Sequence, residues 1–103
     1  MAENERELRQ QICEIGRLMY QKGWVASNDG NLSIKLGPDR YLCTPTNISK
    51  GMMTPDDLII VNANGDKVEG KRERTSEIMM HLTIYAGRQD VGSVVHAHPP
   101  VST

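Results

Sequence analysis

The chain has 103 residues, of which 38% are hydrophobic and 24% charged, and its formal net charge is −1. This length fits one domain, 1–103, and the near-neutral charge excludes the basic surface expected of a nucleic-acid-binding protein. There is no signal-peptide pattern and no apolar run near the roughly 18 residues that span a bilayer, so we expect a cytoplasmic protein without a membrane partner. Cys13 and Cys43 lack a CxxC spacing, which indicates reduced packing residues.

The N-terminal part of the chain predicts an amphipathic helix over residues 3–22, ending near Gly23. Its apolar positions at helical spacing are Leu8, Ile12, Ile15 and Met19. Turn-forming residues follow at 27–31 and can expose backbone N–H groups. We therefore expect a surface helix followed by a polar loop.

Strands are predicted in the middle of the chain. Residues 32–36 alternate between apolar and polar side chains, which indicates a strand with one buried face. A turn at 37–39 leads into a second strand over 40–44, so that the two strands form a hairpin. After a loop over 44–55, the apolar run 58–61 predicts a buried strand.

The C-terminal part adds a second helix and a last strand. Asn64-Gly65 is a strong tight-turn signal, residues 75–88 show helical periodicity, and the apolar run 91–95 predicts a buried final strand. Helices alternating with strands that are partly joined by hairpins indicate an α/β layered domain with a mixed or mainly antiparallel sheet. An apolar final strand without a covering helix indicates a fragment, or a chain that a partner completes.

Two histidines follow the final apolar run. Because side chains two residues apart on a strand lie on the same face, His96 and His98 present adjacent imidazoles suited to a metal ion. A catalytic zinc site normally takes three protein ligands, so a third ligand is required. His81 shares a helix face with Glu77 and is a possible third ligand, but its apolar neighbours favour a packed histidine.

Three polar segments are candidate anion sites. The loops Asn28-Asp29-Gly30-Asn31 and Thr44-Pro45-Thr46-Asn47 are rich in turn-forming residues, and Thr75-Ser76-Glu77 opens the second helix. Hydroxyls and backbone N–H groups at a helix N-terminus suit phosphate, although a plain N-cap at Thr75 or Ser76 explains the same residues. Their occurrence together with a histidine pair and a carboxylate favours a site for an anionic substrate.

The motifs occur in a definite order along the chain. They are Gly30-Asn31-Leu32-Ser33, Thr44-Pro45-Thr46, Ser49-Lys50-Gly51, Thr75-Ser76-Glu77, His81, Tyr85, Asp90-Val91 and His96-Ala97-His98-Pro99-Pro100. This ordered set resembles the class II aldolase/adducin family, which includes L-fuculose-1-phosphate aldolase and L-ribulose-5-phosphate 4-epimerase. The resemblance runs over essentially the whole chain, but over only about the N-terminal half of a typical family member.

The resemblance implies a truncated three-layer α/β/α sandwich with a mixed, mainly antiparallel sheet, in a homotetramer with active sites between subunits. It implies that His96 and His98 bind Zn²⁺ or another divalent metal, with the third ligand beyond residue 103, and that Glu77 is the catalytic acid/base. Asn47 stands where many aldolases have glycine, and Thr75 replaces a common serine. The residues expected to bind the substrate phosphate are Asn28, Asn31, Thr46, Asn47, Thr75 and Ser76.

The resulting functional hypothesis is a zinc-dependent lyase that cleaves a phosphorylated ketose, of the L-fuculose-1-phosphate type, through a metal-stabilised enediolate. The same residues serve pentulose-phosphate 4-epimerases, sugar-acid decarboxylases and a thiosugar-phosphate dehydratase in this family. The non-catalytic alternatives are an inactive fragment and an adducin-like assembly module. Retention of His96, His98 and Glu77 favours an enzyme over the adducin-like module.

Overall fold

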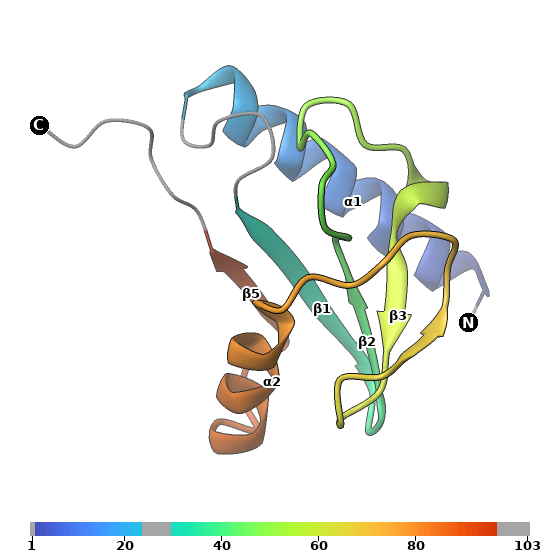
Figure 1. Ribbon diagram of the computed structural model, residues 1–103, viewed down its shortest axis with the longest axis vertical. Coiled ribbons are helices and arrows are strands. Elements are labelled where there is room, and N and C mark those ends of the chain that lie inside the picture. Colours follow the sequence, from blue (N-terminus) through green and yellow to red (C-terminus); the bar gives the residue numbers. More distant parts are fainter. Residues whose placement is uncertain (1, 24–29, 97–103) are drawn as a thin grey trace, which may run out of the picture.

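The computed structural model describes residues 2–23 and 30–96 as two helices, a short 3₁₀ helix and a five-stranded sheet. In chain order the elements are α1 (Ala2–Gln21), β1 (Asn31–Gly37), β2 (Arg40–Cys43), η1 (Pro55–Asp57), β3 (Ile59–Val61), β4 (Lys67–Glu69), α2 (Ile78–Gly87) and β5 (Ser93–His96). The sheet lies between α1 and α2 (Figure 1), so the predicted α/β/α layering is confirmed.

The strand order is β4-β3-β2-β1-β5, and every pair among these strands is antiparallel. Strand β1, next to the edge of the sheet, therefore pairs with β2 on one side and β5 on the other. Ser33 of β1 lies opposite Cys43 of β2 and Val94 of β5, and Asn31 lies opposite His96. Because paired residues point to the same face, this register decides which side chains of three strands meet.

Two apolar clusters hold the layers together. Side chains alternate along the strands, so Leu42 and Ile60 pack toward α1 while their neighbours Cys43 and Ile59 pack toward α2. On the α1 side the cluster includes Ile12 and Met19 of the helix, and on the α2 side it includes Ile78, Leu82 and Tyr85. The sheet is thus buried on both faces at its centre.

Two expectations about burial are wrong. Ile15 was expected on the apolar side of the first helix, but it is 40% exposed because it lies outside the stripe that Ile12 and Met19 bury. The final strand was expected to be buried, but Val95 is 55% exposed. β5 is an edge strand of this sheet, and only its Val94 side packs against the cluster under α2.

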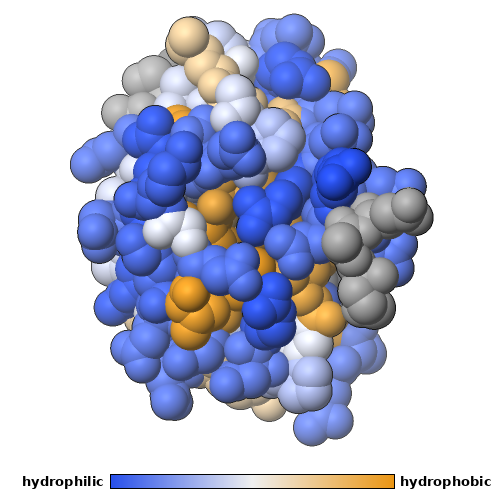
Figure 2. Space-filling model, turned by 90° about the vertical axis from the view of Figure 1, so that its right-hand side faces the viewer, coloured by the Kyte–Doolittle hydropathy of each residue, from blue (hydrophilic) through white to orange (hydrophobic). Residues whose placement is uncertain are grey.

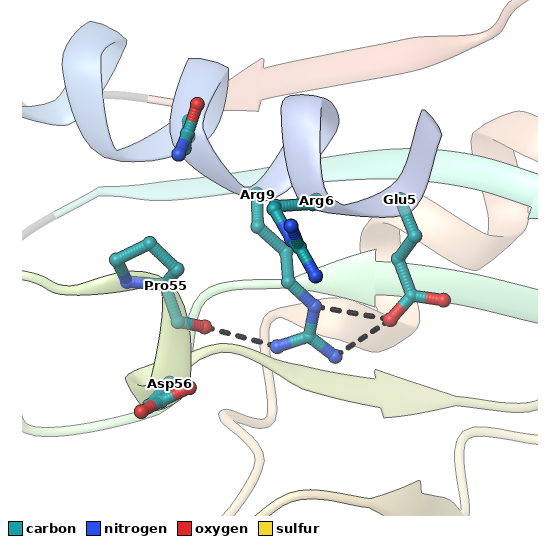
Figure 3. Close-up of a pocket in the computed structure, with 6 residues that line it drawn as sticks. Glu5, Arg6, Arg9, Pro55 and Asp56 are labelled. Atoms are coloured by element: carbon teal, nitrogen blue, oxygen red, sulfur yellow. Dashed lines mark hydrogen bonds and ion pairs between the residues drawn. The ribbon is translucent and has the colours of Figure 1, made fainter. Parts of the chain in front are cut away.

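Arg9 fastens α1 to η1. Its guanidinium donates to Glu5 at 3.0 Å, one turn away on the same helix, and to the carbonyl oxygen of Pro55 at 2.9 Å (Figure 3). A shallow pocket lies beside this contact, with Arg6 and Asp56 among the residues that line it. Its lining carries both signs of charge, and it belongs to the α1 side of the molecule.

The molecular face in Figure 2 is mostly hydrophilic, with apolar residues showing in small patches between polar ones. Neither of the two described α-helices combines the length and the apolar character that a membrane crossing requires.

Candidate functional site

A carboxylate, an amide and an imidazole meet on the α2 side of the sheet. Asn31 opens β1 and His96 closes β5, and the antiparallel register places the two opposite each other. Glu77 immediately precedes α2. Asn31 Nδ2 donates to Glu77 Oε1 at 2.5 Å, and His96 Nδ1 lies 3.1 Å from the same oxygen.

The Glu77–His96 contact determines which ring nitrogen of His96 carries the hydrogen. An ionised carboxylate can only accept a hydrogen bond, so His96 Nδ1 carries the hydrogen, and in the uncharged form of the ring the lone pair lies on Nε2. The two side chains are 39% and 31% exposed, so a small molecule can reach them. Proteins commonly orient a metal-binding imidazole in this manner, with its second nitrogen donating to a carboxylate.

This arrangement fits one part of a divalent-metal site. His96 Nε2 is a suitable zinc donor, and the carboxylate of Glu77 fixes the ring. His98 lies outside the described residues. Within residues 2–23 and 30–96, no three His, Cys, Asp or Glu side chains come together as a metal-binding group.

A second set of polar groups is buried deeper in the same layer. Ser33 Oγ lies 2.7 Å from His81 Nδ1 and 2.9 Å from the hydroxyl of Tyr85, so one serine joins β1 to two positions of α2. His81 is fully buried, and its Nε2 has no hydrogen-bond partner in the part of the chain that the structure describes. The expectation of a packed histidine is therefore confirmed.

Electrostatics keep this buried set neutral. Burial lowers the pKa of His81, and the nearby His96 lowers it further, against the opposing effect of Glu77. Burial likewise raises the pKa of Tyr85, although its hydrogen bond with Ser33 works in the opposite direction. The imidazole of His81 is thus a neutral group beneath Glu77 and His96.

Two of the predicted phosphate loops run side by side. Thr46 N donates to the carbonyl oxygen of Glu73 at 3.0 Å, and Pro45 forms an isolated antiparallel bridge with Arg74. These contacts bring the segment after β2 next to the segment that leads into Thr75. Both loops are therefore held at the end of the sheet from which Glu77 approaches Asn31.

The start of the second helix was predicted too early. α2 begins at Ile78, and Glu77, in place of Thr75 or Ser76, occupies the N-cap position without a side-chain capping bond. Thr75 Oγ1 accepts a hydrogen bond from Glu77 N at 3.3 Å, while Ser76 is exposed. The Thr75 hydroxyl therefore bonds within the turn at residues 76–77 that leads into the helix.

Two predicted phosphate residues remain to be placed. Asn47 is exposed and has a φ of 58°, in the left-handed region that favours glycine and also admits asparagine. Asn28 lies outside the described residues. The structure thus brings Asn31 to Glu77, and Thr46 to the strand-like segment before Thr75.

Sequence reasoning missed the roles of Thr44, Ser33 and Tyr85 in this region. Ser33 was expected on the solvent side of its strand, but it is 1% exposed because α2 covers that face. The available signal was its spacing: Ser33 is two residues from Asn31 and so shares its face. Thr44 is completely buried and donates from Oγ1 to Asn31 Oδ1 at 3.3 Å.

The cysteines are free and buried, as expected. Burial raises the pKa of Cys43 to about 12, and burial also raises the pKa of Cys13. A thiolate nucleophile is therefore excluded at neutral pH, and the chemistry of this site lies with the carboxylate and the imidazole.

A known protein family matches most of this chain. Residues 10–103 match the family model described as the class II aldolase and adducin N-terminal domain. The chain belongs to this family. An L-fuculose phosphate aldolase from Methanococcus maripaludis is 40% identical over 88 residues, which are 85% of this chain and 47% of that protein.

Other relatives of this class II aldolase family member carry different names. A methylthioribulose-1-phosphate dehydratase from Pseudomonas fluorescens is 31% identical over 98 residues, covering 95% of this chain and 47% of that protein. A solved structure of an L-fuculose 1-phosphate aldolase superposes with a TM-score of 0.82 at 28% identity, covering 91% of this chain and 45% of that one. The chain thus spans just under half the length of these relatives.

Proposed function

We propose that the protein is a metal-dependent lyase that reversibly cleaves a phosphorylated ketose of the L-fuculose 1-phosphate type. The observation that carries the proposal is the convergence of Asn31 and His96 on one oxygen of Glu77. The relatives named L-fuculose phosphate aldolase and methylthioribulose-1-phosphate dehydratase support a sugar phosphate as the substrate class.

In this proposal His96 and His98 hold a divalent cation, with Zn²⁺ as the first choice. The cation, when bound, supplies Lewis-acid polarisation of a substrate oxygen. Glu77 is placed to move a proton to and from the substrate carbon, because its carboxylate is partly exposed and held by two donors.

In this proposal the polar segments around Glu77 bind the substrate phosphate. Asn31 has two hydrogens on Nδ2, so its bond to Glu77 leaves one for a phosphate oxygen. Thr46, Thr75 and Ser76 supply hydroxyls from the two adjacent loops. Holding the phosphate in this way fixes the reacting bond relative to the acid/base carboxylate.

A dehydratase of a thiosugar phosphate is the second candidate function. Several relatives at 30–35% identity carry the name methylthioribulose-1-phosphate dehydratase. Dehydration also needs a proton removed next to a carbonyl group, so Glu77 serves both reactions. The two functions differ in which bond breaks, and therefore in the products.

The test is separate incubation of the protein with L-fuculose 1-phosphate, L-ribulose 5-phosphate or methylthioribulose 1-phosphate. The products of each reaction are identified by NMR. We expect an aldehyde and a ketose phosphate fragment from the first substrate, lost on chelation and restored by Zn²⁺. Glu77→Gln should lower the rate by about 10²–10⁴-fold. The matched control is Glu73→Gln, since the Glu73 side chain is 83% exposed and near the same segment.

If only methylthioribulose 1-phosphate gave a product, the protein would be assigned as the dehydratase and not the aldolase. If only L-ribulose 5-phosphate reacted, by epimerisation, both assignments would be wrong. Equal rates for the Glu77→Gln and Glu73→Gln variants would contradict the role of Glu77. We further propose a homotetramer, which light scattering of the same preparation measures.

A further inference from the structure

We propose that Thr44 is a positioning residue that holds the side-chain amide of Asn31 with its nitrogen toward Glu77. This inference rests on the proposed function only in taking Glu77 as the acid/base group. Thr44 acts on the carboxylate of Glu77 through Asn31.

The hydroxyl of Thr44 lies between a donor and an acceptor. The backbone N–H of Leu32 can only donate, and it lies 3.2 Å from Thr44 Oγ1. The hydroxyl therefore accepts there, and because Asn31 Nδ2 donates to Glu77, its single hydrogen goes to Asn31 Oδ1, 3.3 Å away. A backbone bond from Thr44 N to the carbonyl oxygen of Leu32, at 3.0 Å, keeps the two residues in this relation.

That bond supports one orientation of the Asn31 amide. With Oδ1 turned to Thr44, Nδ2 faces Glu77 Oε1 at 2.5 Å. The opposite orientation would place two acceptor oxygens against each other unless the carboxyl group carried a proton. Thr44 thereby selects the arrangement in which an ionised Glu77 is hydrogen-bonded.

Burial makes this selection effective. Thr44 is completely buried and Asn31 is 6% exposed, so bulk water cannot easily replace the hydroxyl. A buried amide oxygen that loses its donor is destabilised, which weakens the preference of the amide for this orientation. Removal of the Thr44 hydroxyl should therefore be detectable at the side-chain nitrogen of Asn31, the residue to which it donates.

The test compares Thr44→Val, which keeps the shape but removes the hydroxyl, with Thr44→Ser, which keeps the hydroxyl. The side-chain ¹H–¹⁵N signals of Asn31 are recorded in metal-free protein without substrate, after selective labelling of asparagine. We expect one Asn31 amide proton at unusually low field in the unchanged protein, because of its short bond to a carboxylate. The Thr44→Val variant should lose this shift and the Thr44→Ser variant should keep it.

A folded Thr44→Val variant with an unchanged Asn31 signal would overturn the proposal, as would loss of the signal in Thr44→Ser. Circular dichroism establishes folding, and Thr44→Ala gives the same comparison if the valine variant does not fold. Turnover supplies a second readout: Thr44→Val should lower kcat/KM about tenfold, and Thr44→Ser should leave it nearly unchanged. If the Asn31 signal follows Thr44 but no sugar phosphate is converted, the positioning stands and the proposed function fails.

Discussion

At the scale of single residues, Ser33 joins the sheet to α2. Its hydroxyl meets His81 Nδ1 and the Tyr85 hydroxyl, and all three groups are buried. Loss of this one oxygen would leave the buried His81 Nδ1 without its partner and would remove one of the hydrogen bonds of the Tyr85 hydroxyl. Such groups lose their hydration on folding and need an internal partner in exchange.

We therefore expect Ser33→Ala to lower the free energy of unfolding by about 1–3 kcal/mol. Urea unfolding monitored by circular dichroism measures this change. Ser93→Ala is the matched control, because Ser93 is exposed on β5 and its loss should change stability by less than about 0.5 kcal/mol. Equal midpoints for the two variants would show that the Ser33 hydroxyl contributes nothing to the α2–sheet contact.

At the scale of elements, α1 lies close to the loop after β2 at Gly16. A Cβ built there would be 2.8 Å from the carbonyl oxygen of Lys50 and 2.8 Å from Met53 Cε. One of these two atoms belongs to the backbone, which cannot rotate away as a flexible side chain can. The loop and the helix therefore pack at a distance that only a glycine permits.

Two effects compete in a Gly16→Ala variant. Alanine favours the helix by about 1 kcal/mol, but overpacking typically costs about 1–3 kcal/mol. We expect the clash to dominate and the melting temperature to fall. Gly87→Ala is the control, since Gly87 also belongs to a helix and a Cβ there meets nothing within 4 Å. A melting temperature raised by Gly16→Ala would show that the loop yields easily.

The elements themselves could largely be predicted from the sequence, and the contacts between them could not. Alternation over 32–36 predicts the strand, but its polar side was assigned to solvent because α2 is distant in the sequence. The meeting of Asn31 with His96 depends on the pairing register of β1 and β5. No local pattern specifies that register, so the resemblance to a family, not the spacing, pointed to Glu77.

At the scale of the whole molecule, the buried His81 makes stability depend on pH. Its pKa is lowered chiefly by burial, whereas the unfolded chain titrates it near its ordinary value of 6.5. The unfolded state therefore binds more protons below that value, and stability falls with falling pH. The contribution of His81 is complete above about pH 6.5 and is lost as the pH falls through its lower folded value.

We expect the free energy of unfolding to decrease between pH 8 and pH 5.5, and His81→Gln to reduce that slope. Denaturant titrations at the two pH values measure both quantities. His96→Gln is the comparison variant, because it removes the smaller effect of His96 but leaves the burial of His81, so most of the slope should remain. A slope that survives in His81→Gln would assign the acid sensitivity to other groups.

The left-handed backbone at Asn47 has a thermodynamic consequence. A residue with a side chain already adopts a conformation that glycine enters without steric cost. Exchange for glycine would relieve a small native strain but would also give the denatured chain more freedom. These two changes oppose each other, so the loop can exchange asparagine and glycine with little net effect on stability.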